Sequence, residues 1–346
     1  MAQFTSLQDP DIAIIAAAYQ LGAVQSWQAI TAGTVNSNFA LSTDRGRFFV
    51  RVNEGNTLPD VEWEAALLAA LGMAGVAIAP LCVTTEQRVT LPLLAGGEAK
   101  YISVFPWLHG RHLAADDVDI TTAAAVGRLL AHLHQATAPL LPTLARPNRY
   151  DFAEISRRAQ SFAQSTDPAL QRANATIALE LQAIAAVASV RHRAGQVIIH
   201  GDLFRDNVLW SSAATPTLLD FEQASVGSAA YDLAVCLHDW AWRGPTHEAH
   251  ERTLEAGSNP DWGLVEALLR GYHAVRPLQF NDIVALPWEL RMSAVRFTVT
   301  RVTDVYLANQ DNPDKDFRAF LARADYWRSE AANAQLLQLT NSMVAG

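Results

Sequence analysis

A polar stretch of eleven residues, His200–Trp210, constrains the fold more than any other part of the sequence. Apolar residues precede it at 197–199 and end it at 208–210. Short apolar runs on both sides of a polar centre predict a loop held between two short buried strands. Two side chains in this loop, Asp202 and Asn207, carry groups that can do chemistry.

The spacing of three polar residues predicts what that chemistry is. Four residues separate Asp202 from Asn207, and Asp220 follows on a second apolar run at 218–221. The base and the metal-binding Asn of the H-R-D-x-x-x-x-N loop in protein kinases have the same spacing, and a D-F-G aspartate follows them. Mg²⁺ prefers hard oxygen ligands, here Asn207 and Asp220, while a carboxylate such as Asp202 accepts or orients a hydroxyl proton. The alternative is that the three are turn and capping residues, but their combined spacing between two strands favours a kinase-like site.

The composition indicates an ordinary enzyme of the cytoplasm. A chain of 346 residues with 50% hydrophobic residues can bury a large core, and we expect two domains, 1–105 and 106–346. Cys82 and Cys236 lie in apolar contexts, which favours reduced thiols. We expect no export signal and no membrane span. The net charge of −9 disfavours a nucleic acid partner.

The first hundred residues predict a helix followed by a sheet. Apolar residues recur at helical spacing over 11–21, and strand-like runs follow at 27–30, 39–42 and 48–52. The turn between the first two strands spans 32–38 and ends in Asn36, Ser37 and Asn38. Such a turn can offer backbone N–H groups to phosphates, although a plain hairpin turn is the alternative.

A basic and an acidic residue follow at the positions that a kinase would need. Arg51, on the third strand, lies where kinases have the lysine that holds the α- and β-phosphates. Glu64, on a helix expected over 60–71, lies where the glutamate that positions this lysine is expected. The alternative for Arg51 is an ion pair with a surface carboxylate.

Two further strands, 89–94 and 101–105, complete the predicted sheet, and Phe105 and Trp107 lie in the connector that follows. In a kinase-like architecture the adenine would stack on apolar side chains such as these two. The alternative is that both rings belong to the core.

Helical periodicity dominates the rest of the chain. We expect helices over 121–137 and 168–194, with a proline-rich linker at 139–147 between them. Only ten residues separate Asp220 from a helix that starts at Tyr231, which leaves no room for the segment on which protein kinases dock peptides. A small-molecule acceptor is therefore expected. We predict that Asp232, at the start of this helix, is buried and braces the 200–210 loop.

Several motifs resemble one family. The segments His200–Leu209, Asn36–Phe39 and Tyr231–Trp240 are similar to those of the bacterial homoserine kinases, which belong to the aminoglycoside phosphotransferase and choline kinase superfamily. Arg296–Arg301, on a helix expected to begin near Pro287, resembles the Arg-Phe-x-x-Ser-Arg segment of that family. The sequence departs from the family pattern at three places: Arg51, Phe221–Glu222 and His238.

The resemblance implies a two-lobed, protein kinase-like α+β fold, with an N-terminal antiparallel sheet lobe and a larger helical C-terminal lobe. It implies ATP and Mg²⁺ as cofactors, with Asp202 as base, Asn207 and Asp220 as metal ligands, and Asn36–Asn38 as phosphate cover. The implied reaction converts L-homoserine to O-phospho-L-homoserine.

A homoserine pocket must bind an ammonium and a carboxylate. Glu222 and Asp239 are candidates for the ammonium, and Arg296 or Arg301 for the carboxylate, because paired Arg–carboxylate bonds are strong and directional. The alternative for all four residues is a structural or surface ion pair.

Two other functions stay open at this point. Another small alcohol, such as an aminoglycoside or a choline-like cation, would suit the net negative charge and Glu222. A nucleotide-binding regulator without catalysis is motivated by Arg51, but the presence of Asp202, Asn207 and Asp220 disfavours it.

Overall fold

The computed structural model describes residues 5–30, 35–95, 97–211, 215–242, 259–308, 312 and 315–344. The chain divides into two compact units. Unit 1 comprises Met1–Arg111 and Trp210–Glu222, and unit 2 comprises His112–Leu209 and Gln223–Gly346. The division into domains 1–105 and 106–346 that we expected remains a prediction.

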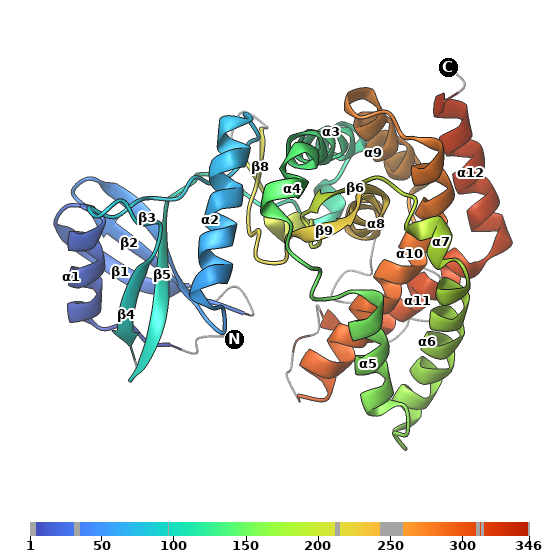
Figure 1. Ribbon diagram of the computed structural model, residues 1–346, viewed down its shortest axis with the longest axis horizontal. Coiled ribbons are helices and arrows are strands. Elements are labelled where there is room, and N and C mark those ends of the chain that lie inside the picture. The colour runs from blue at the N-terminus through green and yellow to red at the C-terminus, as the bar shows by residue number, and fades with distance from the viewer. Residues whose placement is uncertain are drawn as a thin grey trace. The chain divides into compact units, whose positions relative to one another are not determined.

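Unit 1 contains, in its described part, an antiparallel sheet of five strands in the order β1-β2-β3-β5-β4 (Figure 1). The strands are β1 (Val24–Ile30), β2 (Ser37–Thr43), β3 (Gly46–Asn53), β4 (Leu91–Ala95) and β5 (Glu98–Pro106). The strand β8 (Pro216–Leu218) and the end of β7 (Val208–Trp210) also belong to this unit. The register places Arg51 of β3 opposite Asn38 of β2 and Ser103 of β5.

Two helices of unit 1, α1 (Asp9–Ala18) and α2 (Leu58–Met73), flank this sheet (Figure 1). Val50 and Val52 of β3 are fully buried in one core with residues of α1 such as Ile15. Since successive residues of a strand point to opposite faces, Arg51 points away from this core. It meets α2 there, which explains how a charged residue can lie in the middle of a sheet.

Local sequence fixes where α2 begins. Thr57 is its N-cap, and Pro59 follows in the first turn, where its missing N–H costs no helical hydrogen bond. The Asp60 carboxylate accepts a hydrogen bond from the Thr57 amide at 3.1 Å, and the Thr57 hydroxyl accepts one from the Asp60 amide at 3.4 Å. This reciprocal capping box starts the helix two residues before the position that we expected.

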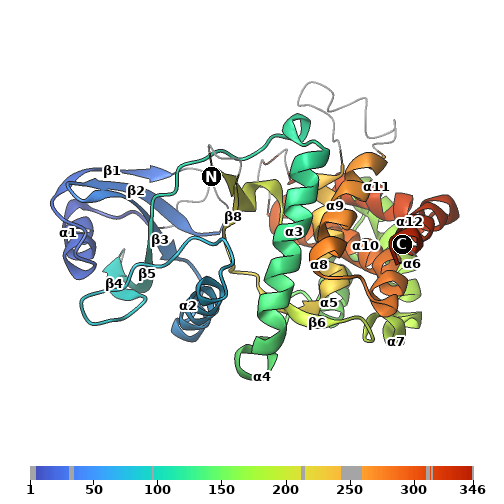
Figure 2. The same ribbon diagram turned by 90° about the horizontal axis from the view of Figure 1, so that it is seen from above.

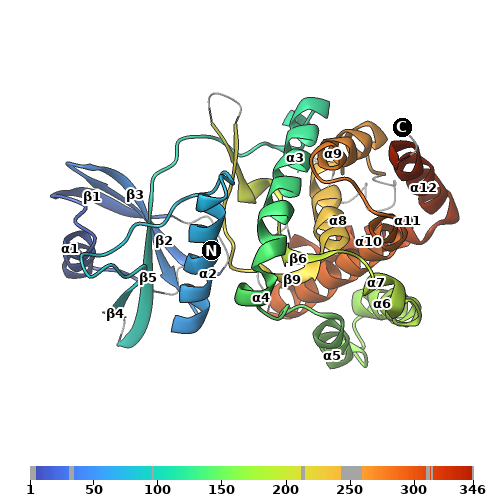
Figure 3. The ribbon, with the colours of Figure 1, turned by 45° about the horizontal axis from the view of Figure 1, so that its top comes forward.

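Unit 2 is mainly helical (Figures 1 to 3). Its longer helices are α3 (Ile120–Thr137), α5 (Phe152–Phe162), α6 (Pro168–Ala186), α8 (Ala229–Trp240), α9 (Trp262–Val275), α10 (Phe280–Arg301), α11 (Phe317–Arg328) and α12 (Glu330–Val344). The short helices are α4 (Leu141–Leu144) and α7 (Ala188–Arg191), and a π-helical turn, Val302–Tyr306, follows α10. The strands β6 (Gln196–Ile199) and β9 (Ser225–Ser228) form an antiparallel pair.

The helices α3 and α9 pack against each other (Figures 2 and 3), and two glycines lie in their contact. A Cβ atom on Gly127 would lie 2.1 Å from the backbone oxygen of Leu268, and one on Gly271 would lie 2.1 Å from the backbone oxygen of Ala124. Neither position can hold a side chain unless a helix moves. The close contact brings His134 of α3 within reach of Tyr272 of α9.

The structure corrects two expectations in unit 2. The helix that we expected to begin near Pro287 begins at Phe280, and Pro287 lies inside it. Proline removes one helical hydrogen bond there, but nearly every residue from Asp282 to Val299 is buried, so packing outweighs that loss. The predicted linker at 139–147 contains a turn of 3₁₀-helix and the short helix α4.

Two simpler expectations can be compared directly. Cys82 and Cys236 are free thiols, as expected. Of the helices within the described ranges, none combines the length and the apolar character that crossing a membrane requires.

Candidate active site

The loop at 200–207 in unit 2 is held by Asp232, the buried carboxylate in the first turn of α8. Its two oxygens accept hydrogen bonds from the backbone amides of His200 and Gly201, each at 2.8 Å. Gly201 has a φ of +78°, a left-handed conformation that favours glycine. The predicted bracing role of Asp232 is confirmed by these contacts.

A third group supports the same carboxylate. His134 Nε2 donates to Asp232 Oδ2 at 3.0 Å, and the Tyr272 hydroxyl lies 2.7 Å from His134 Nδ1. Burial alone would raise the pKa of Asp232, but these hydrogen bonds lower it below its usual value. Burial lowers the pKa of His134, so the imidazole stays neutral. The loop is therefore anchored by the ionised carboxylate of Asp232, which accepts hydrogen bonds from the loop backbone and from His134.

Apolar and polar contacts fix the middle of the loop. Leu203 is fully buried, and its carbonyl accepts a hydrogen bond from Trp240 Nε1 at 3.1 Å. Asn207 Nδ2 donates to the backbone oxygen of Asp202 at 2.7 Å. A hydrogen bond from the Asn207 side chain to the Asp202 backbone thus connects the two predicted site residues of the loop.

The Asp202 carboxylate is held from one side by two residues of unit 2. Gln223 Nε2 donates to Asp202 Oδ2 at 3.0 Å, and Arg296 Nη1 lies 3.6 Å from Asp202 Oδ1. Arg296 also donates to the amide oxygen of Gln223. The Asp202 side chain is 23% exposed, whereas that of Arg296 is 3% exposed. This leaves a partly accessible carboxylate with a buried cation behind it.

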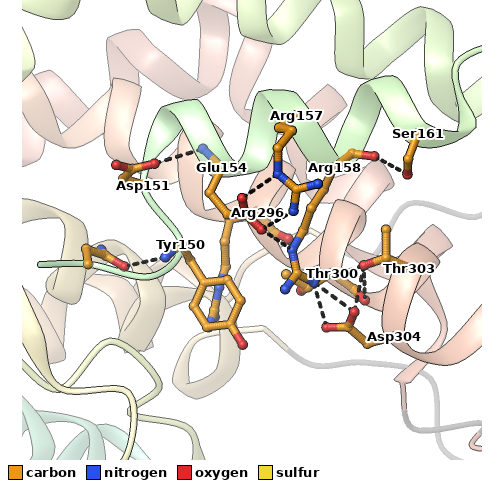
Figure 4. Close-up of polar contacts among 11 residues, drawn as sticks. Tyr150, Asp151, Glu154, Arg157, Arg158, Ser161, Arg296, Thr300, Thr303 and Asp304 are labelled. Carbon is orange, nitrogen blue, oxygen red and sulfur yellow. Dashed lines mark hydrogen bonds and ion pairs between the residues drawn. The ribbon is translucent and has the colours of Figure 1, made fainter. Parts of the chain in front are cut away.

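Aromatic rings hold the Arg296 guanidinium in place. Its central carbon lies 3.8 Å from the Phe297 ring centre and 4.5 Å from the Tyr150 ring centre. Figure 4 shows Tyr150 just before α5 and beside Arg296 of α10. Arg158 of α5 in turn bonds Glu154 at 2.8 Å and Asp304 at 2.8 Å, which fixes α5 against the π-helical turn (Figure 4).

Asp239, a predicted ammonium ligand, is paired with Arg205 of the loop. The carboxylate accepts from the Arg205 backbone amide at 2.7 Å, from Nε at 3.0 Å and from Nη2 at 3.1 Å. Asp206 follows Arg205 in the chain, and burial together with the charges of Asp239 and Asp202 raises the pKa of Asp206 to about 6. The role of Asp239 in binding a substrate remains a prediction.

Arg301, the second predicted carboxylate ligand, ends α10. Its Nη1 donates to the backbone oxygen of Asp316 at 3.0 Å. Burial lowers the pKa of Arg301 to about 10, although the charges of Asp239 and Asp202 act in the opposite direction. The charges of Asp202 in the loop and of Asp239 on α8 therefore both favour the charged form of this guanidinium.

In unit 1, Arg51 is in contact with two carboxylates. Its Nη2 lies 2.6 Å from Glu64 Oε2, so the expected ion pair is present, and its Nη1 lies 3.8 Å from Asp220 Oδ1. Burial opposes the charge, but Glu64 and Asp220 raise the pKa of Arg51 above its ordinary value. Arg51 Nε is buried without a hydrogen-bond partner. The predicted pair thus holds a cation that retains hydrogen-bonding capacity.

The same residues line a small pocket of about 20 Å³ within unit 1. Four predicted site residues line it: Arg51, Glu64, Phe105 and Asp220. Asp220 has a φ of +57°, a left-handed conformation that most residues with a side chain disfavour and that Asp adopts more readily, and its carboxylate is 49% exposed. The exposed carboxylate is therefore presented from a backbone conformation that carries a free-energy cost.

The turn residues of the predicted phosphate cover take part in structural hydrogen bonds. Asn36 Nδ2 donates to Glu222 Oε2 at 2.7 Å, and Ser37 Oγ donates to Glu54 Oε1 at 2.8 Å. Asn38 Oδ1 is buried without a hydrogen-bond partner. Residues 32–34 of this predicted turn lie outside the described residues.

Of the four predicted substrate ligands, Glu222 belongs to unit 1. Asp239, Arg296 and Arg301 belong to unit 2. Burial and the charge of Asp220 raise the pKa of Glu222.

The two predicted adenine-stacking rings have different surroundings. Phe105 is buried, with the Arg51 guanidinium carbon 5.3 Å from its ring centre. Trp107 is stacked on Arg47, whose guanidinium carbon lies 3.6 Å from a ring centre. Their part in nucleotide binding remains a prediction.

Sequence reasoning missed Gln223, Arg205 and Arg323. Gln223 follows the metal-ligand motif by three residues, and a polar side chain this close to Asp220 was the signal that could have pointed to it. Arg323 lies on α11, more than a hundred residues after the loop. Only the tertiary fold brings it to α8, where its Nη1 donates to the backbone oxygen of His238 at 2.8 Å.

Comparison with known proteins agrees with this geometry. Residues 26–278 match the phosphotransferase enzyme family. The chain is 32% identical over 305 residues to the homoserine kinase of Beijerinckia indica, covering 88% of each chain. It is 29% identical over 332 residues to that of Gluconobacter oxydans, covering 95% of this chain and 99% of the relative.

A solved structure shares the fold. The amicoumacin kinase hAmiN, in complex with AMP-PNP, Ca²⁺ and Ami, superposes with a TM-score of 0.67 at 13% identity, over 91% of this chain and 93% of that one. The predicted kinase-like α+β fold is confirmed by this likeness. Because the family match extends over most of the chain, from the sheet of unit 1 through the braced loop to α9, this chain belongs to the phosphotransferase enzyme family.

Proposed function

We propose that the protein phosphorylates the hydroxyl group of L-homoserine, with ATP as donor and Mg²⁺ as cofactor, to give O-phospho-L-homoserine for threonine biosynthesis. The relatives named homoserine kinase support this acceptor at about 30% identity over most of both chains. The observation that carries the proposal is the Asp202 carboxylate, which is held by Gln223 and Arg296 and yet remains partly exposed.

The surroundings of Asp202 support an acceptor that carries both charges. Unit 2 holds the carboxylates of Asp206 and Asp239 and the cation of Arg301 within electrostatic range of the loop. Homoserine at neutral pH has an ammonium and a carboxylate. Charges of both signs near one hydroxyl-binding position match this zwitterion better than they match a purely cationic alcohol such as choline.

The residues assigned to nucleotide and metal have suitable chemistry. Arg51 keeps a buried, unbonded Nε and can donate to phosphate oxygens. Asn207 donates its Nδ2 inward, so its Oδ1 is the atom left for a cation, and Asp220 presents a half-exposed carboxylate. Across the described residues, no group of three or more His, Cys, Asp or Glu side chains could hold a metal alone. This suits Mg²⁺, which shares its ligands with nucleotide phosphates.

In the proposed reaction Asp202 accepts the hydroxyl proton of the acceptor while the hydroxyl oxygen attacks the γ-phosphorus of ATP. The bond between this phosphorus and the bridging oxygen breaks, and ADP leaves. Gln223 and Arg296 orient the carboxylate, and Arg51 neutralises phosphate charge. Mg²⁺, when bound, offsets the negative charge that develops on the phosphoryl oxygens.

A coupled assay of ADP release with purified protein tests the proposal. We expect turnover of L-homoserine with a kcat/KM at least ten times that for choline or an aminoglycoside, about the discrimination that one charged contact supplies. Chelation of divalent cations should abolish turnover. Turnover of choline or an amino sugar without turnover of homoserine would contradict the acceptor, and no ATP-dependent turnover of any alcohol would contradict the kinase.

A further inference from the structure

Two arginines in unit 2 share one aromatic ring. Arg301 ends α10, and Arg323 lies on α11 three residues after Phe320. The guanidinium carbon of each lies 4.4 Å from the centre of the Phe320 ring. A planar cation packed on a ring is held in orientation, with its N–H groups directed along the edge of the guanidinium plane. Two cations are thus fixed around one hydrophobic side chain.

Among the residues that the structure describes, neither guanidinium forms a direct ion pair with a carboxylate. Arg301 Nη1 donates to the backbone oxygen of Asp316 at 3.0 Å, and Arg323 Nη1 donates to the backbone oxygen of His238 at 2.8 Å. Arg323 Nε is buried without a hydrogen-bond partner. A neutral carbonyl satisfies one N–H group but does not offset a full charge, so both cations retain the capacity for an anion.

Neighbouring arginines differ in this respect. Arg205 forms a paired interaction with Asp239, and Arg296 is committed to Gln223 and Asp202. Of the two arginines that we considered for a substrate carboxylate, Arg296 therefore serves the reacting carboxylate itself. Arg301 is the one that forms no ion pair with a carboxylate of the described residues, since its Nη1 donates to a backbone oxygen.

The two cations are also costly to keep together. Burial and, to a smaller extent, the charge of Arg301 lower the pKa of Arg323 to about 9. Burial likewise lowers the pKa of Arg301 to about 10. Like charges that repel each other in a desolvated place are relieved by an anion between them. This arrangement is typical of a binding site, because a purely structural arginine is usually paired within the protein.

We propose that Arg301 and Arg323 bind the carboxylate group of the acceptor, and so select amino acid alcohols over simple amino alcohols. The inference rests on the proposed function and deepens it by naming the specificity residues. The position agrees with the role, since the charges of Asp239 and Asp202 act on Arg301. The acceptor hydroxyl would face Asp202, and its carboxylate would be bound by the arginine pair.

Substitution of Arg323 tests the site, with two acceptors that differ in one group. L-homoserine carries the carboxylate, and 3-aminopropan-1-ol is the same amino alcohol without it. In Arg323→Met, which keeps a chain of similar length, we expect the ratio of kcat/KM for homoserine to kcat/KM for aminopropanol to fall about 100-fold. The KM for ATP should stay unchanged. Arg323→Lys, which keeps a positive charge but not the planar fork, should recover part of the ratio.

The matched control is Arg328→Met, on the same helix, where the arginine is 42% exposed and bonds Asp325 one turn away. Its acceptor ratio should equal that of the wild type. If Arg323→Met lowered turnover of both acceptors equally, or left their ratio unchanged, the carboxylate site would be refuted.

A binding measurement separates failure of this inference from failure of the proposed function. L-2-aminobutyrate has the ammonium and carboxylate of homoserine but no hydroxyl, so its binding does not depend on phosphoryl transfer. Calorimetry should show binding to the wild type and to Arg328→Met, and none to Arg323→Met. If the wild type phosphorylates no alcohol but shows this pattern, the site stands and the proposed function fails. If the wild type does not bind 2-aminobutyrate, the site is refuted.

Discussion

Gln223 connects Asp202 to Arg296 through a single side-chain amide. Its Nε2 donates to Asp202 Oδ2 at 3.0 Å, and its Oε1 accepts from Arg296. The amide thus fixes the orientation of the Asp202 carboxylate and is itself held by the buried Arg296 guanidinium. Gln223 therefore holds the Asp202 carboxylate in a fixed orientation, which a positioned base requires.

We predict that Gln223→Leu lowers kcat about 10-fold, since it removes one hydrogen bond to a charged group. The KM for ATP should stay unchanged, because the contacts of Gln223 are with Asp202 and Arg296. Gln160→Leu, at an exposed position of α5, is the control and should leave both quantities unchanged. A lower kcat accompanied by a raised KM for ATP would assign Gln223 a packing role only.

Asp202 itself should be indispensable for turnover. Positioned bases contribute about 10²–10⁴-fold to rate, so Asp202→Asn should lower kcat by about 1000-fold and leave ATP binding intact. Fluorescence titration with a nucleotide analogue measures the binding. Asp325→Asn, at an exposed position of α11, serves as the control. A variant that keeps a tenth of the wild-type kcat would show that Asp202 is not the base.

For Arg51, we expect a change in nucleotide affinity. Arg51→Ala removes the cation that Glu64 holds at 2.6 Å, and the KM for ATP should rise about 10-fold or more, because a charged hydrogen bond to phosphate is lost. Arg51→Lys should stay active, since an ammonium can take the same place. Arg88→Ala, an exposed arginine of unit 1 paired with Glu86, is the control. An unchanged KM in Arg51→Ala would leave the ion pair a structural one.

His238 should make stability depend on pH. Its Nε2 donates to the backbone oxygen of Leu290 at 2.9 Å, and burial together with the charge of Arg323 lowers its pKa from 6.5 to about 3. Below pH 6.5 the unfolded state therefore binds a proton that the folded state does not. Stability contributed by the neutral ring is present above pH 6.5 and is lost as pH falls toward 3, by about 1.4 kcal/mol per pH unit.

Between pH 7 and pH 5 this loss amounts to about 2 kcal/mol. We predict that chemical denaturation of His238→Asn shows a loss of unfolding free energy over this range that is smaller by that amount. His132→Asn, at an exposed position of α3, should match the wild type. Equal pH dependence in His238→Asn and the wild type would mean that His238 is protonated in the folded state.

The sequence predicted the parts of the site that local pattern determines. Apolar runs on both sides of the 200–207 loop predicted its two strands, and the position of Asp232 at a helix start predicted its bracing role. The Arg51–Glu64 pair followed from the positions at which kinases have a strand lysine and a helix glutamate. In each case the groups involved lie on elements whose type and order the hydrophobic pattern reveals.

The residues that sequence reasoning missed depend on contacts between distant elements. Arg205 occupies Asp239 from 34 positions away, and Arg323 shares Phe320 with the end of α10. No periodicity within α11 distinguishes Arg323 from the exposed arginines of the same helix. Pro287 misled the prediction because a helix start is where proline usually occurs, whereas burial of α10 permits it inside.

The glycine contact between α3 and α9 limits how this part of the chain can evolve. At both Gly127 and Gly271, an added methyl group would meet backbone of the other helix, not a side chain. A second substitution cannot relieve such a clash, because a smaller side chain opposite it removes no backbone atom. Neither glycine can therefore be replaced, one substitution at a time, while the two helices keep this geometry. Descendants of this chain can move His134 of α3 relative to Tyr272 of α9 only by repacking both helices at once.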